Sequence, residues 1–299
     1  MEKLRLSSSL EVSRIAQGFW RLLDWGMNTK ELVNFINQSF ELGVTTFDHA
    51  DIYGDYEVEE EFGKALKANP GLRNQMQLVS KCGIALTSSK FPDRRTKHYD
   101  TSFGHIVASV NRSLEMLGTD HLDLLLIHRP SPYMNFGEVA TAFSQLKADG
   151  KVLNFGVSNF NAIQFNSLNM ACDEPLVTNQ VEFSPYCLEH IENSNMDFLQ
   201  TKKIHPMAWS PLGGGELVSP TTERGERVDN KLRELANGYG TTVDVLAYAW
   251  ILAHPTKTIP IVGSGKIERL KTATQSLNIH LATEDWFEIL VASQGHEIP

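Results

Sequence analysis

Eight short apolar runs, each followed by a stretch with apolar residues at helical spacing, form the dominant pattern of this sequence. Alternating strands and helices predict a parallel sheet, because parallel neighbours need a long crossover connection. The predicted strands cover residues 14–20, 44–48, 75–83, 121–130, 152–159, 175–185, 204–213 and 258–265. The predicted helices cover residues 28–43, 58–70, 105–118, 136–150, 161–171, 196–203, 229–240, 243–255, 267–277 and 283–293.

Eight strand–helix units close naturally into a barrel, so we predict an α/β fold, a (β/α)8 TIM barrel, that spans residues 1–299 as a single domain. The main alternative is an open, doubly wound sheet. Such a sheet normally carries a GxGxxG motif after its first strand when it binds a dinucleotide, and no such motif follows residues 14–20. A polar stretch at about 213–229 is interpreted as an insert.

The composition supports a substantial core, since 41% of the residues are hydrophobic and 21% are charged. The net charge of −9 argues against a general nucleic-acid or membrane-surface binder, which would need a basic patch. Three cysteines without CxxC spacing suggest neither a disulfide framework nor a zinc cluster. No apolar run approaches the roughly 20 residues of a membrane span. We therefore expect a cytoplasmic protein with no membrane or nucleic-acid partner and no metal.

Ionisable side chains stand at the ends of neighbouring predicted strands, where the active sites of barrels lie. Three apolar runs end in Asp48, Lys81 and His128, and Tyr53 follows the first of them. A lysine at the end of a buried strand needs an anion, which Asp48 can supply. Considered singly, Asp48 and Lys81 could be a structural ion pair, and His128 could be a core histidine.

Together, these four side chains can deliver a proton to a carbonyl oxygen. A phenol has a pKa of about 10 and donates poorly at neutral pH. A nearby ammonium group stabilises the phenolate and lowers that pKa, while a carboxylate keeps the ammonium charged and in place. A neighbouring imidazole can donate a hydrogen bond to the substrate oxygen and orient it.

The same residues lie in a series of motifs that resembles the aldo-keto reductases. The motifs run in the order of that family from residue 44 to about 273: FDHADIYG, VSKCG, LLLIHRP, FGVSNF, TNQVEFSP, AWSPLG and IVGSGKIERL. In motif detail they are most similar to the bacterial YdhF-type oxidoreductases. The resemblance implies a monomeric barrel that binds NADPH, with NADH also possible, without a Rossmann domain. It also implies an N-terminal β-hairpin that plugs the barrel bottom and extra helices at the C-terminus.

The resemblance implies a role for each matching residue. Tyr53 would be the general acid, Lys81 its partner, Asp48 the anchor of Lys81, and His128 the group that orients the substrate. The cofactor would be bound by Ser158, Asn159 and Gln180 at the nicotinamide carboxamide, by Trp209 at the ring, by Ser210, Pro211, Leu212 and Gly213 at the pyrophosphate, and by Gly263, Ser264, Lys266 and Arg269 at the 2′-phosphate.

The predicted reaction is the reduction of an aldehyde or ketone to an alcohol. Loop residues would line the substrate pocket: Trp20, Tyr53, His128 and Arg129, with Trp25, Tyr56, Phe91 and Tyr133 as further candidates. His49 and Asp51 are interpreted as local loop structure.

Two rival functions follow from the same residues. A metal-dependent hydrolase would use Asp48, His49, Asp51 and His128 as ligands. A non-catalytic sensor or regulatory subunit would bind NADPH without turnover, and the presence of all four candidate catalytic residues does not distinguish it from an enzyme.

Overall fold

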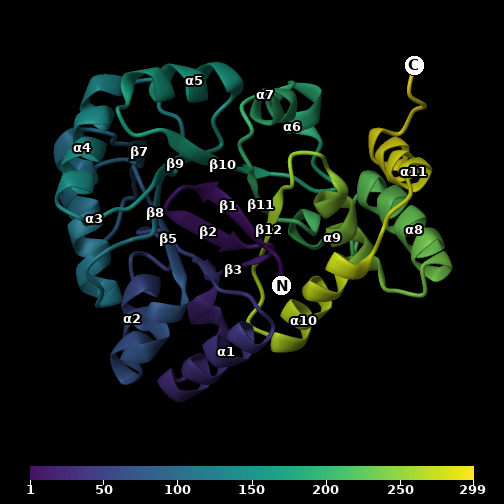
Figure 1. The fold of residues 1–299 in the computed structure, drawn as a ribbon, viewed down its shortest axis with the longest axis horizontal. Helices are drawn as coiled ribbons and strands as arrows, with labels where there is room; N and C mark the ends of the chain where they lie inside the picture. Colours follow the sequence, from purple (N-terminus) through teal and green to yellow (C-terminus); the bar gives the residue numbers. More distant parts are fainter. The chain divides into compact units, whose positions relative to one another are not determined.

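A computed structural model, which describes residues 1–299, has eight parallel strands in a closed barrel with the order β10-β11-β12-β3-β4-β5-β8-β9 (Figure 1). Each strand lies within one of the eight predicted ranges. The strands are β3 (Ala16–Gly18), β4 (Thr46–Asp48), β5 (Gln77–Cys82), β8 (Leu124–Ile127), β9 (Phe155–Ser158), β10 (Leu176–Glu182), β11 (Met207–Trp209) and β12 (Ile259–Val262). The predicted (β/α)8 barrel is confirmed.

The chain divides into two compact units, one of residues 1–180 and 263–267, the other of residues 181–262 and 268–299. The boundary near residue 180 falls inside β10, and the single-domain organisation stays a prediction. The first unit contains α1 (Thr29–Glu41), α2 (Val58–Ala68), α3 (Phe103–Leu117), α4 (Phe136–Ala148) and α5 (Ala162–Ala171), with the 3-10 helices η1 (Leu22–Trp25) and η2 (Pro70–Gln75). The second contains α6 (Glu189–Glu192), α7 (Asn195–Thr201), α8 (Glu223–Gly238), α9 (Val243–Ala253), nearly all of α10 (Ile267–Gln275), α11 (Thr283–Gln294), η3 (Gly213–Gly215) and η4 (Ser276–Asn278).

The N-terminal residues form the predicted hairpin, with β1 (Lys3–Ser7) antiparallel to β2 (Leu10–Ser13). Side-chain hydrogen bonds attach this hairpin to the N-terminal ends of barrel strands. The Ser13 hydroxyl accepts from the amides of Thr45 and Thr46 at 3.1 and 3.2 Å, and the Ser7 hydroxyl donates to Asn154 Oδ1 at 2.6 Å. Because β4 and β9 start at these points, the hairpin lies at the end of the barrel opposite the strand ends that carry the candidate site.

Helix α8, the short helix α6 and a second hairpin differ from the prediction. Helix α8 begins at Glu223 and not at residue 229, so the second half of the predicted insert is helical. The Thr222 hydroxyl caps it by accepting from the Gly225 amide at 3.1 Å, and Val228 and Leu232 form its buried face. The many charged residues of this stretch hid the helical spacing of its apolar residues. A second hairpin, β6 (Ile84–Ala85) with β7 (His98–Tyr99), was not predicted because both strands are two residues long.

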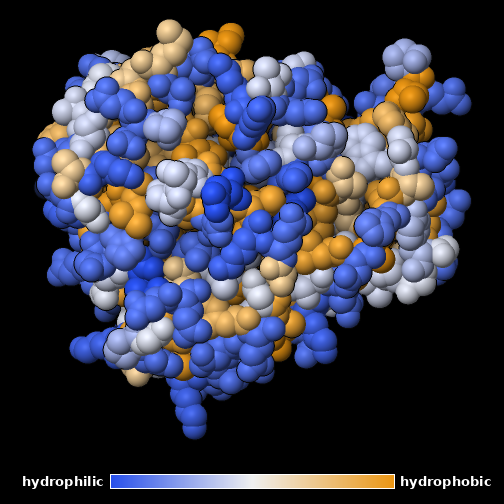
Figure 2. All heavy atoms as spheres, in the orientation of Figure 1, coloured by the Kyte–Doolittle hydropathy of each residue, from blue (hydrophilic) through white to orange (hydrophobic).

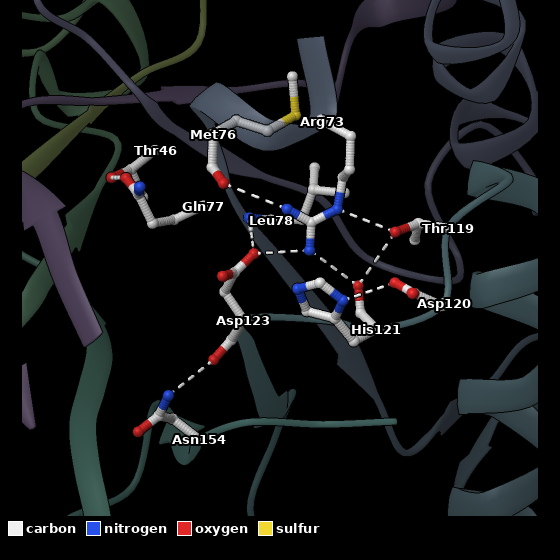
Figure 3. Close-up of polar contacts among 10 residues, drawn as sticks. All are labelled: Thr46, Arg73, Met76, Gln77, Leu78, Thr119, Asp120, His121, Asp123 and Asn154. Carbon is white, nitrogen blue, oxygen red and sulfur yellow. Dashed lines mark hydrogen bonds and ion pairs between the residues drawn. The ribbon is translucent and has the colours of Figure 1, made fainter. Parts of the chain in front are cut away.

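An arginine joins the N-terminal ends of β5 and β8 (Figure 3). Arg73 donates through Nη2 to Asp123 Oδ2 at 2.9 Å and to the carbonyl of His121 at 3.0 Å. The same Asp123 oxygen accepts from the amide of Leu78 at 2.8 Å. Both charged side chains are largely buried, at 14% and 16% exposed, so the pair ties the start of one strand to the start of the next.

Hydrophilic side chains dominate the face drawn in Figure 2, and hydrophobic ones appear between them in patches. None of the helices combines the length and the apolar character that crossing a membrane requires.

Candidate active site

Lys81 is the centre of the candidate site. It lies on β5, and its side chain is fully buried. Its ammonium group donates three hydrogen bonds, to Asp48 Oδ2 at 2.7 Å, to the carbonyl of His49 at 2.7 Å and to the Tyr53 hydroxyl at 3.1 Å. An ammonium has three protons to donate. The polar capacity of Lys81 is therefore fully used, and Tyr53 is held against a charged group.

His128 directly follows β8, and its ring faces that of Tyr53 edge-on, with 6.0 Å between the ring centroids. The amide of His128 donates to the carbonyl of Cys82 at 2.9 Å, which continues the pairing of β5 with β8. The structure thus brings together all four residues predicted for catalysis. They come from three adjacent strands and the turn after β4.

The pKa values of these groups follow from burial and from one another. Burial raises the pKa of Tyr53 above 10, and the nearby charge of Lys81 works against that rise. Burial disfavours the charge on Lys81, but Asp48 and Tyr53 more than offset it, so the lysine pKa is raised. Burial, followed by the charges of Lys81 and Arg129, lowers the pKa of His128 well below its usual value. At neutral pH the phenol carries its proton, the ammonium is charged and the imidazole is neutral.

The sequence correctly predicted that Lys81 lowers the pKa of Tyr53, but it did not predict that this pKa is raised overall. The phenol lies between strand ends in a largely buried position, and there the cost of charging it is larger than the stabilisation by one ammonium.

Asp48 has a second partner that the sequence did not predict. Its Oδ1 accepts from the side-chain amide of Gln180 at 2.7 Å, while its Oδ2 accepts from Lys81. Gln180 lies on β10, 132 residues away in the chain, and only closure of the barrel brings it to β4. A residue predicted to contact the cofactor therefore also orients the anchor of Lys81.

The three residues predicted at the carboxamide form one hydrogen-bonded group. Asn159 donates to the Ser158 hydroxyl at 2.8 Å, and that hydroxyl donates to the carbonyl of Gln180 at 2.8 Å. Asn159 has a left-handed backbone, with φ of +62°, directly after β9. These amide side chains are fixed by protein contacts at the carboxyl ends of β9 and β10.

The remaining predicted cofactor residues lie at the ends of β11 and β12. Trp209 is the last residue of β11, and the turn after it contains Ser210, Pro211, Leu212 and Gly213. Gly213 has φ of +59°, and a Cβ there would lie 2.7 Å from that of Tyr186, so the position requires glycine. After β12, Gly263 and Ser264 form a turn that leads to Lys266, and Arg269 lies in the first turn of α10. Both cations are exposed.

The predicted substrate residues differ in exposure. Trp20 follows β3 and is 61% exposed, with the Arg21 guanidinium 5.1 Å from its ring centroid. Arg129 is half-buried beside His128. Of the further candidates, Trp25 is half-buried and lies against Phe19 and Phe35, and Tyr56 is only 7% exposed. Little of the Tyr56 side chain is therefore open to a ligand.

His49 and Asp51, interpreted as local loop structure, follow β4 outside any helix or strand, and both side chains are buried. The His49 ring stacks on Phe19 with 4.7 Å between centroids, and neither ring nitrogen has a hydrogen-bond partner. Burial, followed by the charge of Lys81, lowers its pKa to about 3. Asp51 Oδ2 lies 3.4 Å from Arg112 Nη2, and burial and the charge of Glu59 raise its pKa to about 7. Alternation of apolar and polar letters gives no sign that a short turn is buried.

The residues proposed as ligands in the metal-dependent rival do not form a ligand set. No three His, Cys, Asp or Glu side chains converge closely enough to hold a metal ion.

Comparison with known proteins identifies the family. The model of the Aldo/keto reductase family matches residues 14–292. The chain belongs to the aldo-keto reductase family. Oxidoreductase relatives match it over nearly its whole length, so the predicted family and the prediction of an oxidoreductase enzyme are confirmed.

Among these relatives, the uncharacterized oxidoreductase YcsN of Bacillus subtilis is 46% identical and is matched over 100% of both chains. The oxidoreductase YdhF of Escherichia coli is 45% identical over 97% of this chain and 96% of its own. A 6-dehydroglucose reductase of Agrobacterium fabrum is 41% identical over 100% of both. The crystal structure of the thermostable aldo-keto reductase Tm1743 has the same fold, with a TM-score of 0.80 and 24% identity over 98% of this chain and 100% of that one.

Proposed function

We propose that this protein reduces an aldehyde or ketone carbonyl to an alcohol with NADPH, and that Tyr53 is the general acid. The observation that carries the proposal is the hydrogen-bonded series Asp48–Lys81–Tyr53, which ends in a phenol that keeps its proton at neutral pH.

The chain offers donors suited to a nicotinamide dinucleotide. Amide side chains at the ends of β9 and β10 match a carboxamide, and the exposed cations Lys266 and Arg269 match a phosphate at the start of α10. When bound, NADPH supplies the hydride that reaches the carbonyl carbon. Residues Ser158, Asn159, Gln180, Trp209, Ser210, Pro211, Leu212, Gly213, Gly263, Ser264, Lys266 and Arg269 would hold it.

The protein's own groups complete the reduction at the carbonyl oxygen. Tyr53 transfers its proton to this oxygen as negative charge develops there. Lys81, 3.1 Å from the phenol oxygen, stabilises the phenolate that remains, and Asp48 keeps Lys81 charged. The neutral His128 has one N–H and can donate it to the same oxygen, which orients the carbonyl.

The relatives' names suggest one specific substrate. Two relatives, 41% and 36% identical to this chain, are named 6-dehydroglucose reductases. We therefore propose 6-dehydroglucose as the first compound to test, beside simple aldehydes and ketones. Trp20 and Arg129 would contact it near Tyr53 and His128.

One relative keeps the sensor alternative open. A putative voltage-gated potassium channel subunit beta of Schizosaccharomyces pombe is 27% identical to this chain. Both functions include NADPH binding, so turnover of a carbonyl substrate is the property that distinguishes them.

The test is NADPH consumption with 6-dehydroglucose, aldehydes, ketones and quinones, in steady state and in a single turnover of bound NADPH. We expect turnover with at least one carbonyl, and a loss of about 100-fold or more in Tyr53→Phe, since a positioned acid contributes about 10²–10⁴-fold. Wild-type rates in Tyr53→Phe would remove Tyr53 as the acid. Tight NADPH binding without turnover of any carbonyl would favour the sensor.

We also propose that the protein is a cytoplasmic monomer that folds as one domain. Light scattering after size exclusion tests the oligomeric state, and a single cooperative unfolding transition seen by several probes tests the domain organisation.

A further inference from the structure

The turn that follows Tyr53 has an unusual backbone. Gly54, Asp55 and Tyr56 have φ values of +56°, +53° and +69°, all in the left-handed region. Glycine adopts such values freely, but they are uncommon for other residues and rarest for bulky ones such as tyrosine. Two consecutive side-chain-bearing residues in this region persist only where surrounding contacts stabilise them.

Tyr56 makes several of these contacts with residues 86–94, which lie between β6 and β7. Its hydroxyl accepts from the amide of Leu86 at 3.0 Å and from Arg94 Nη1 at 2.7 Å. Its ring packs edge-on against Phe91, with 4.9 Å between the centroids. The Tyr56 side chain is buried under this segment, which explains how a tyrosine remains at a left-handed position.

Asp55 is held by the same segment. The Ser88 hydroxyl donates to Asp55 Oδ2 at 2.9 Å, and Lys90 Nζ donates to the Asp55 carbonyl at 2.9 Å. Both of the non-glycine residues with positive φ in this turn are therefore bound to residues 86–94.

Arg112 on α3 also contacts the turn. Its guanidinium carbon lies 4.9 Å from the centroid of the Tyr56 ring, and its Nη2 lies 3.4 Å from Asp51 Oδ2. The amide of Asp51 donates to the carbonyl of Lys81 at 3.0 Å. Tyr53 thus lies between two fixed points, Asp51 on one side and Tyr56 on the other.

We propose that Tyr56, held by residues 86–94 and by Arg112, is a positioning residue that fixes the left-handed turn and so places the Tyr53 phenol against Lys81. The proposal rests on the acid role proposed for Tyr53. The contact it protects is the 3.1 Å hydrogen bond between Lys81 and the Tyr53 hydroxyl. A misplacement of about 1 Å at a reacting group can cost about 100-fold in rate.

The test compares Tyr56→Phe with the matched control Tyr239→Phe. The Tyr239 hydroxyl also accepts from a backbone amide, that of Ala282 at 3.0 Å, and also bonds a charged side chain, Asp285, but it belongs to the second unit. Both variants lose a phenol oxygen with two partners, so both should lose thermal stability to a similar extent.

The first readout needs no cofactor or turnover. In protein labelled with ¹³C at tyrosine Cζ, the Tyr53 signal is assigned from its absence in Tyr53→Phe. We expect its chemical shift and its titration midpoint to change in Tyr56→Phe and to stay unchanged in Tyr239→Phe.

The second readout is kinetic. We expect kcat to fall about 10-fold or more in Tyr56→Phe, with the alkaline limb of the pH–rate profile displaced, because the phenol is the displaced group. The NADPH dissociation constant should stay within about two-fold, since the predicted cofactor residues lie outside this turn. Tyr239→Phe should match the wild type in kcat, in the pH–rate profile and in the NADPH dissociation constant.

Arg94→Met is the second variant, for the case that Tyr56→Phe does not fold. It removes one donor to the Tyr56 hydroxyl and should move the same readouts in the same direction by less. The proposal is overturned if both variants lose stability as Tyr239→Phe does while the Tyr53 signal and the pH–rate profile stay as in the wild type. Failure of the acid role appears separately, as retained activity in Tyr53→Phe, and leaves the Tyr53 signal as a test of the positioning.

Discussion

Replacing Asp51 by asparagine should change how the stability of this protein depends on pH. Arg112 lies near two buried carboxyl groups, Asp51 and Glu59, and one guanidinium cannot neutralise both. Burial raises the pKa of Glu59, and burial together with the charge of Glu59 raises the pKa of Asp51 from 3.8 to about 7. The folded protein therefore holds a proton on this pair at pH values where the unfolded chain has released it.

The sign and the size follow from linkage. Between pH 3.8 and about 7 the folded state binds the extra proton, so its free energy of unfolding falls as the pH rises. At about 1.4 kcal/mol per pH unit, that window corresponds to a loss of about 4 kcal/mol. Asparagine does not titrate, and in the variant Glu59 has Arg112 to itself. Asp51→Asn should therefore gain about 4 kcal/mol relative to the wild type between pH 4 and pH 7.5.

The assay is chemical denaturation followed by tryptophan fluorescence at several pH values from 4 to 8. Buried histidines contribute a slope of opposite sign; His49, for example, has its pKa lowered to about 3 and destabilises the fold as the pH falls below 6.5. These histidines are present in both proteins, so the difference between the two stability curves isolates Asp51. A difference that stays constant to within about 1 kcal/mol over this range would refute the buried, protonated pair.

Four further outcomes are expected. Lys81→Met should lower kcat by about 10²–10⁴-fold while the NADPH dissociation constant, measured by fluorescence quenching, changes little, because the loss falls on proton transfer. His49→Phe should raise the unfolding free energy by about 1–3 kcal/mol, since it removes two buried nitrogens that lack partners; a lower denaturation midpoint would contradict this. Arg73→Met should cost about 3–5 kcal/mol by leaving Asp123 unpaired, with unchanged kcat per folded molecule. Lys266→Ala should raise KM for NADPH and leave KM for NADH unchanged, and equal effects on both would argue against a 2′-phosphate contact.

The sequence predicted the barrel because each strand is a short apolar run bounded by turn residues, and burial on both faces requires that composition. It predicted Asp48, Lys81 and His128 because a barrel places strand ends on one rim, and Tyr53 because it follows Asp48 in the adjoining turn. Asp48, Lys81 and His128 lie where this rule puts them. The start of helix α8 was not predicted, because its many charged residues hid the apolar spacing of its buried face.

The features that the sequence did not predict depend on contacts between segments that are far apart in the chain. The bond from Gln180 to Asp48 joins β10 and β4, which are not neighbours in the sheet and lie opposite each other in the order of the closed barrel. The burial of His49 and Asp51 depends on α2, α3 and the aromatic side chains around them, and neither residue type favours burial. The interpretation of these two residues as local loop structure carries no information on their burial, which only packing reveals.

The turn after Tyr53 shows the same limit at the backbone level. Gly54 adopts a left-handed backbone freely and aspartate tolerates one, yet Tyr56 adopts it as well. Local preference alone would give Tyr56 a negative φ and a different direction for the chain that leaves Tyr53. The contacts that prevent this come from residues 86–94 and from Arg112, about 30 to 60 positions further along the chain. Where local preference and the native backbone disagree beside a candidate acid, strain held by distant contacts is the expected sign of a functional requirement, and it is measurable through Tyr56.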